Sequence, residues 1–151
     1  MVALASALVC CAACGHELPP ASTVPAADAA AGHQHHAPHG GTLVELGGEF
    51  AHVELVLDPD GGSLTAYVLD GEAEESVRLK QPTLAIAIDS PGSQAAQPLE
   101  LAARANILTG ETVGDSSEFS ATEPSLLHRG ALKGRIVEIA VKGQVFRDVQ
   151  F

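Results

Sequence analysis

The residues with the clearest chemical potential are histidines, because four of the seven in the chain lie in the stretch HQHHAPHGG, residues 33–41. Imidazole nitrogens and carboxylate oxygens bind Zn(II), Cu(II) and similar ions when three or four of them converge at about 2.0–2.2 Å from one metal. The candidate metal ligands are His33, His35, His36, His39, His52 and Glu54. A flexible tract that meets a strand in this way predicts reversible binding of a divalent transition metal, Zn or Cu, with an affinity that falls as the histidines protonate.

The alternative interpretation of the tract is a polar linker that binds metals only as a histidine tag does. A histidine on a half-exposed strand, such as His52 taken alone, is more often a surface residue than a ligand. His16 and His128 are isolated in the sequence, and the pattern assigns them no role. The choice depends on whether the elements that follow the tract bring His52 and Glu54 to its end.

The part of the chain that must position these side chains has the pattern of an all-β domain. From Thr42 onward, short alternating or β-branched runs recur between turn signals such as DPDGG and DSPGS, without a convincing helical period. Eight or nine short strands predict an immunoglobulin-like β-sandwich, and EPSLLHRG, residues 123–130, predicts a single helical turn. The expected strands are residues 42–46, 49–57, 63–69, 76–80, 83–88, 97–103, 117–121, 133–142 and 145–151.

The period of two along a strand places His52 and Glu54 on one face of the sheet. If DPDGG closes a hairpin that pairs Leu57 with Leu64, the alternating aliphatic residues between them face the core. Glu54 then lies directly opposite Tyr67 on the other face. His52 shares that face with both.

The glycines beside the tract predict how it approaches this face. A two-residue turn at residues 47–48 would place Gly41 opposite Glu54. By the same count, His39 projects on the face of His52 and Glu54. Because Gly41 has no side chain, it leaves space above Glu54 that His39 or the neighbouring histidines can reach.

The N-terminal segment has the features of an export signal. All three cysteines, Cys10, Cys11 and Cys14, lie in MVALASALVCCAACG, where residues 2–13 are small and apolar but too short to span a bilayer. CAACG resembles a bacterial lipobox, although Cys11 stands where that motif prefers Leu, and it would make Cys14 the lipidated first residue of the mature protein. The alternative is an ordinary cleaved signal or a chance apolar start. We expect a signal peptide with a lipobox at residues 1–14, a flexible Pro/Ala linker that ends in the His-rich tract at 15–40, and the β-sandwich at 41–151.

Composition argues against several other functions. The formal net charge of −11 repels phosphate backbones, so we expect no nucleic-acid partner. The body has no cysteine for a disulfide, a thiolate metal site or a blue-copper centre. The sequence contains neither G-x-S-x-G nor H-E-x-x-H, and we expect that the protein is not an enzyme.

The stretch HAPHGGTLVELGGEFAHVELVLD, followed by LTAYVLDGEAE, resembles small histidine-rich extracytoplasmic proteins and adaptor subunits associated with bacterial heavy-metal efflux pumps, in which an HGG segment opens a β-domain. The resemblance implies that His36, His39 and His52 contact metal. The chain has no long coiled-coil hairpin and no lipoyl-type domain, so a complete pump adaptor is not expected. The resemblance implies a small accessory protein that captures, buffers or delivers metal beside such a pump. Together with the lipobox, it predicts a periplasmic or outer-membrane-anchored lipoprotein with the membrane and envelope efflux components as partners.

A lipid-anchored interaction or structural domain of the envelope, with no specific metal site, is the competing function. Its interface would be the C-terminal run GRIVEIAVKGQVFRDVQF, residues 134–151. The simpler interpretation of that run is a core hairpin, in which Val137, Ile139 and Val141 alternate inward.

Overall fold

The computed structural model describes residues 35–90 and 95–151 of the chain. The expected signal peptide, the lipidation site at Cys14, most of the expected linker and the candidate ligand His33 lie outside the described residues. One compact unit runs from Gln34 to Phe151. The end of the His-rich tract therefore belongs to the folded domain.

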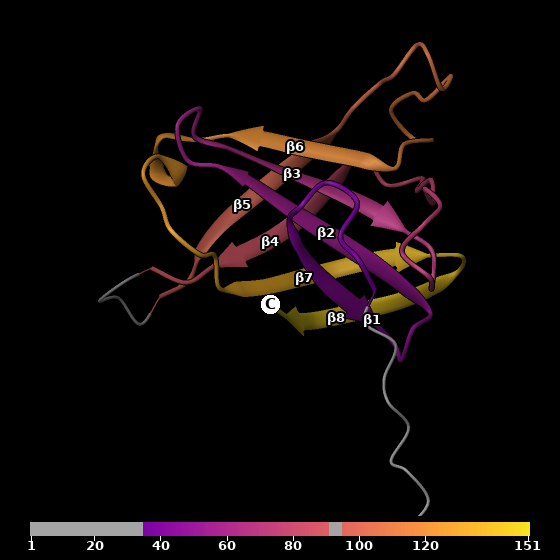
Figure 1. Ribbon diagram of the computed structural model, residues 1–151, viewed down its shortest axis with the longest axis horizontal. Helices are drawn as coiled ribbons and strands as arrows, with labels where there is room; N and C mark the ends of the chain where they lie inside the picture. Colours follow the sequence, from indigo (N-terminus) through magenta and orange to yellow (C-terminus); the bar gives the residue numbers. More distant parts are fainter. Residues whose placement is uncertain (1–34, 91–94) are drawn as a thin grey trace, which may run out of the picture. The chain divides into compact units, whose positions relative to one another are not determined.

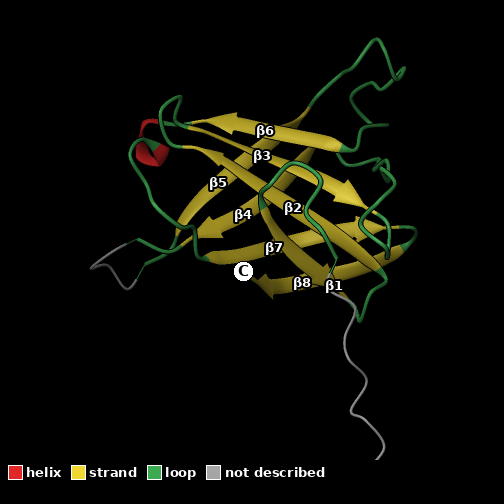
Figure 2. Cartoon of the chain, in the orientation of Figure 1, coloured by secondary structure: helices red, strands yellow, loops and turns green. Residues whose placement is uncertain are grey.

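Eight antiparallel strands form one sheet, and the only helix of the described residues is a single short turn (Figure 2). The strands are β1 (Thr42–Leu46), β2 (Ala51–Asp58), β3 (Ser63–Leu69), β4 (Thr83–Ile88), β5 (Gln97–Ala103), β6 (Glu118–Thr122), β7 (Gly134–Val141) and β8 (Gln144–Gln150). The turn is the 3-10 helix η1 (Pro124–Leu126), which begins with a proline as expected. The expected all-β class with eight short strands is confirmed.

The sheet curls until its two ends meet. Its strand order is β1-β2-β3-β6-β5-β4-β7-β8, and the two edge strands β1 and β8 lie side by side (Figure 1). Alternate residues of the strands fill the enclosed core, as Leu64, Ala66 and Val68 of β3 illustrate. The largest buried side chain of this aliphatic core is Phe119 on β6.

The expected pairing of β2 with β3 is confirmed residue by residue. Leu57 pairs with Leu64, and Glu54 lies opposite Tyr67. The expected β1–β2 hairpin is wrong, because Leu46 pairs with Ala51 instead of Glu49, so that Leu43 and not Gly41 lies opposite Glu54. The cause is a longer turn, in which residues 47–49 all have positive φ. The register moves by two residues, so every side chain keeps its expected face.

Two further expectations are corrected. Residues 76–80 form no strand, because Ser76 bridges to Leu69 whereas Leu79 bridges to Ser116, so the segment changes neighbours instead of following one ladder. Val137 is 38% exposed and not inward, since the β4–β7 register shifts between Ala85 and Ile86 and leaves Val137 outside the regular alternation. Among the described residues there is no helix of the length and apolar character that membrane crossing requires.

Candidate functional site

Residues 35–41 fold back over the outer face of β2 and cover Glu54, whose side chain is fully buried. One carboxylate oxygen of Glu54, Oε1, accepts hydrogen bonds from the backbone N–H of His39 and of Gly41, each at 2.8 Å. The other, Oε2, accepts the Nδ1–H of His39 at 2.7 Å. Three charge-assisted hydrogen bonds offset the cost of burying this carboxylate and fix the end of the tract on the strand.

The two glycines of the HGG segment make this approach possible for different reasons. At Gly41, a Cβ atom would lie 2.5 Å from the backbone oxygen of Leu55, so only glycine brings the chain this close to β2. A Cβ atom at Gly40 would meet no other atom, but the backbone there has a φ of +74°. Glycine is therefore favoured at this position by its backbone conformation and not by lack of space. We expected Gly41 to leave space above Glu54. Instead, its lack of a side chain lets the backbone lie against Leu55, and its N–H donates to Glu54.

The ring of His39 stacks on Tyr67, with centroids 3.8 Å apart and planes 11° apart. Burial raises the pKa of the Tyr67 phenol above its ordinary value, and the negative charges of Glu118 and then Glu54 raise it further. The stack holds the imidazole plane of His39, while the hydrogen bond to Glu54 fixes which nitrogen points inward. His39 itself remains 42% exposed.

A second pair of histidines lies on the same covered face. The rings of His35 and His52 are 4.8 Å apart at an angle of 56°. His52 is buried, with 2% of its surface exposed. Its Nδ1–H donates to the backbone oxygen of Asp70 at 3.1 Å, and the Nδ1–H of His35 donates to that of Glu72 at 3.2 Å.

The loop of residues 70–75 supplies both of these backbone oxygens and is itself held in shape by Asp70. The Asp70 carboxylate accepts the backbone N–H groups of Glu74 and Glu75 at 2.9 and 3.2 Å. The hydrogen bond from Glu74 is the largest cause of the lowered pKa of Asp70; burial opposes it, and Glu75 and Lys142 add to it. The loop therefore presents its carbonyl groups to the histidines in a fixed geometry.

The hydrogen bonds determine the tautomer of all three rings. A carbonyl or carboxylate oxygen is an acceptor, so the Nδ1 of His35, His39 and His52 must carry the proton. The neutral ring then has its lone pair on Nε2. Histidines that bind metals in proteins have this arrangement, with the other nitrogen donating to a backbone oxygen or a carboxylate.

Glu49 adds a carboxylate to the His35–His52 pair. Its Oε1 lies 3.5 Å from the Nε2 of His35. A tetrahedral ion with bonds of about 2.1 Å separates any two of its ligand atoms by about 3.4 Å, so this spacing suits two ligands of one metal. It equally suits an ion pair with a protonated imidazole, which predicts that protons and metal compete. No sequence pattern indicated Glu49, which follows two glycines in the β1–β2 turn and has a φ of 64°.

The six candidate ligands thus have different surroundings. His39 pairs with Glu54, and His35 lies against His52, whereas His36 is exposed and His33 lies outside the described residues. Within residues 35–90 and 95–151, no three His, Cys, Asp or Glu side chains form a group that is ready to hold a metal. Both oxygens of Glu54 are engaged with the backbone and ring of the tract.

Comparisons with known proteins give no family for the chain. A scan against protein-family models, a search of curated proteins and a search of solved structures each returned no match.

Proposed function

We propose that the protein is a lipid-anchored, extracytoplasmic metal-binding accessory protein that captures Zn(II) or Cu(II) reversibly. The Nε2 atoms of His35 and His52 are the primary ligands, and the carboxylate of Glu49 is the third. Exposed histidines of the tract, His36 and the half-exposed His39, complete the coordination or hand the ion on. Small movements of these side chains are needed to close the site, which suits exchange instead of permanent retention.

The observation that carries this proposal is the shared use of Nδ1. Three histidines from two segments each donate Nδ1–H to an oxygen that the fold has fixed, and each is left with a lone pair on Nε2. Histidine tags have no such partners. The arrangement favours a defined metal site over a polar linker that binds metals only as a histidine tag does.

In this proposal Glu54 is a positioning residue and not a ligand. Its buried carboxylate holds His39 and Gly41 on the strand, and this brings the preceding residues of the tract toward the start of β2, where His52 lies. Loss of Glu54 would therefore weaken metal binding by releasing the tract.

The location and the biological process rest on the sequence. A lipidated Cys14 and a Pro/Ala linker would hold the domain near a membrane outside the cytoplasm. The resemblance of the HGG segment to proteins of heavy-metal efflux supports a role in capture, buffering or delivery beside a pump. The ion would reach such a pump by ligand exchange between this protein and the metal site of the pump.

Calorimetric titration with Zn(II) and Cu(II) at neutral pH tests the proposal, using the chain that begins at Gly15. We expect one ion per chain, and a loss of affinity of about tenfold or more in both His35→Ala and His52→Gln. The matched control is His128→Asn, which removes an exposed histidine beyond η1, tolerates the positive φ of that position and should leave metal affinity unchanged. Weak binding of several ions that all histidine variants reduce equally would reject the site.

An interaction domain is the second candidate, and one observation favours it. Ile107 and Leu108 are 95% and 93% exposed at the tip of the loop between β5 and β6. Adjacent aliphatic side chains in such a position are typical of contact surfaces. The run 134–151, by contrast, contributes Ile136, Ile139 and Val141 to the core, so the loop is the better candidate interface. If the domain is an interaction module alone, the titration above detects no saturable metal site.

A further inference from the structure

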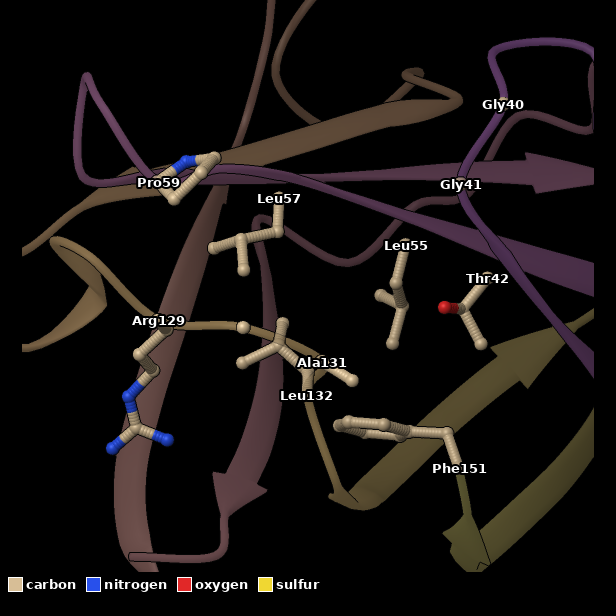
Figure 3. A pocket seen from close by; sticks show the side chains of 11 residues that line it. Gly40, Gly41, Thr42, Leu55, Leu57, Pro59, Arg129, Ala131, Leu132 and Phe151 are labelled. Atoms are coloured by element: carbon tan, nitrogen blue, oxygen red, sulfur yellow. The ribbon is translucent and has the colours of Figure 1, made fainter.

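A cavity of about 410 Å³ lies between the start of β1, the second half of β2 and the segment that precedes β7. Figure 3 shows the side chains of Leu55, Leu57, Leu132 and Phe151 directed toward it, so one wall is aliphatic and aromatic. Arg129, Gly130 and Ala131 also line it. The volume is in the range of small-molecule sites, and too small for a helix or strand of a protein partner.

A second cavity, of about 420 Å³, is lined in part by the same residues, 129–131, as the first. Its lining includes four residues with titratable side chains, His128, Arg129, Lys133 and Asp89. Lys133 and Arg129 outnumber the single carboxylate of Asp89. Such a cationic surface stands out in a chain with a formal charge of −11.

Arg129 lies at the boundary of the two cavities and is held there by the backbone. Its Nε–H donates to the oxygen of Ser125 at 2.8 Å, and Nη1 donates to the oxygen of Asp89 at 3.0 Å. These bonds use two of the five N–H groups of a guanidinium, which leaves donors for an anion. A pre-positioned guanidinium recognises a carboxylate at low entropic cost.

We infer that the two cavities together bind an amphiphilic anion of low molecular weight, a single-chain aliphatic carboxylate. The aliphatic chain lies against Leu57, Leu132 and Phe151, and the carboxylate is bound by Arg129 and Lys133. Charge complementarity selects the anion, and the apolar wall selects the chain over a purely polar acid such as acetate. The residues that would recognise the anion are not the proposed metal ligands, so the two proposals are tested by different variants, although Gly40 and Gly41 of the tract also line the first cavity.

The test is a calorimetric titration of the chain that begins at Gly15 with octanoate. This chain retains every strand and the whole core, which lie within the unit Gln34–Phe151. We expect one octanoate per chain, no detectable binding of acetate, and weaker binding of the uncharged octanol. Equal binding of acetate and octanoate would show a simple anion site and would overturn the inference.

Two variants locate the site. Lys133→Gln should weaken octanoate binding about tenfold by removing a charged partner of the carboxylate. Ala131→Trp should abolish binding, because a large side chain at a residue that lines both cavities would occupy the space of the ligand. A thermal melt of each variant checks that it folds. If the tryptophan disturbs folding, Leu57→Ser should show the same loss of octanoate binding. The control Lys80→Gln changes an exposed lysine elsewhere and should leave affinity unchanged. Absence of octanoate binding, binding that none of the cavity variants alters, or binding only of an acidic peptide, would each overturn the inference.

Discussion

The Nδ1 atom of His39 lies 2.7 Å from Oε2 of Glu54, and the carboxylate that accepts this proton is fully buried. A charge in such a position is costly unless it is fully hydrogen-bonded, which the backbone N–H groups of His39 and Gly41 ensure. Glu54 is therefore the anchor of the tract. His35 reaches His52 because the tract is fixed to β2 by the hydrogen bonds between His39 and Glu54.

The anchor predicts the effect of Glu54→Gln. A carboxamide accepts at only one atom, and its NH₂ group would face N–H donors. We expect a loss of about 1–3 kcal/mol in the free energy of unfolding, measured by chemical denaturation. We also expect Zn(II) affinity to fall about tenfold with the one-to-one stoichiometry kept, as for loss of a positioning partner.

The control for that variant is Glu100→Gln, which changes an exposed carboxylate on β5. It should leave both stability and metal affinity unchanged. A Glu54→Gln protein as stable as the wild type, with unchanged exchange of the His39 and Gly41 amide protons, would refute the anchor.

The glycines of HGG are expected to respond differently to the same replacement. Asparagine tolerates a positive φ, so Gly40→Asn should be nearly neutral, whereas Gly40→Ala should cost about 1–2 kcal/mol. At Gly41 any Cβ meets the backbone of β2, so Gly41→Ala and Gly41→Asn should both cost about 1–3 kcal/mol. Thermal unfolding of the four variants measures the pattern, and a benign Gly41→Asn would contradict the close approach.

Tyr67 is the only tyrosine of the chain, so its ionisation is visible in the ultraviolet absorbance. We expect a midpoint above the ordinary value near 10, because burial and the charges of Glu118 and Glu54 disfavour the phenolate. Glu118→Gln should lower the midpoint, and Glu100→Gln should not. Since the folded-state pKa is raised, the unfolded chain ionises first, and stability should fall as pH rises past about 10.

Glu111 anchors the loop that carries Ile107 and Leu108. Burial alone would raise the pKa of Glu111, but hydrogen bonds from Ser117 and Thr109 outweigh it, with Arg78 assisting, and the pKa lies below its ordinary value. Its contribution to stability is thus present above the unfolded pKa and lost as pH falls through the lowered folded pKa.

Ser117→Ala tests this anchor, because the Ser117 hydroxyl donates to Oε1 of Glu111 at 2.5 Å. The variant should be less stable by about 1–3 kcal/mol at neutral pH. The difference from the wild type should shrink as Glu111 becomes protonated in acid. A difference that stays constant with pH would mean that Ser117 acts through packing and not through the carboxylate.

The sequence predicted the fold and part of the site for a definite physical reason. The period of two placed His52, Glu54 and Tyr67 on one face, and this assignment survived an incorrect β1–β2 turn because the register error was even. The bulge at Val137 reversed one inward assignment, since a single extra residue changes the parity.

The partners of the histidines could not be predicted in this way. Asp70 and Glu72 contribute backbone oxygens, which carry no sequence signal, and Glu49 is brought to His35 by a turn of three residues with positive φ. The burial of His52 and Glu54 depends on the tract folding back over the strand, a contact that strand periodicity does not encode.

The most direct test of the proposed metal site is a Zn(II) titration followed by long-range proton–nitrogen NMR correlations of the histidine rings, on the chain that begins at Gly15. The proposal predicts that Nε2 of His35 and His52 shifts on binding and saturates at one ion per chain, while Nδ1 of both rings stays protonated and His128 is unaffected. Coordination through Nδ1, or parallel shifts of all histidines without saturation, would contradict it and identify the tract as a linker.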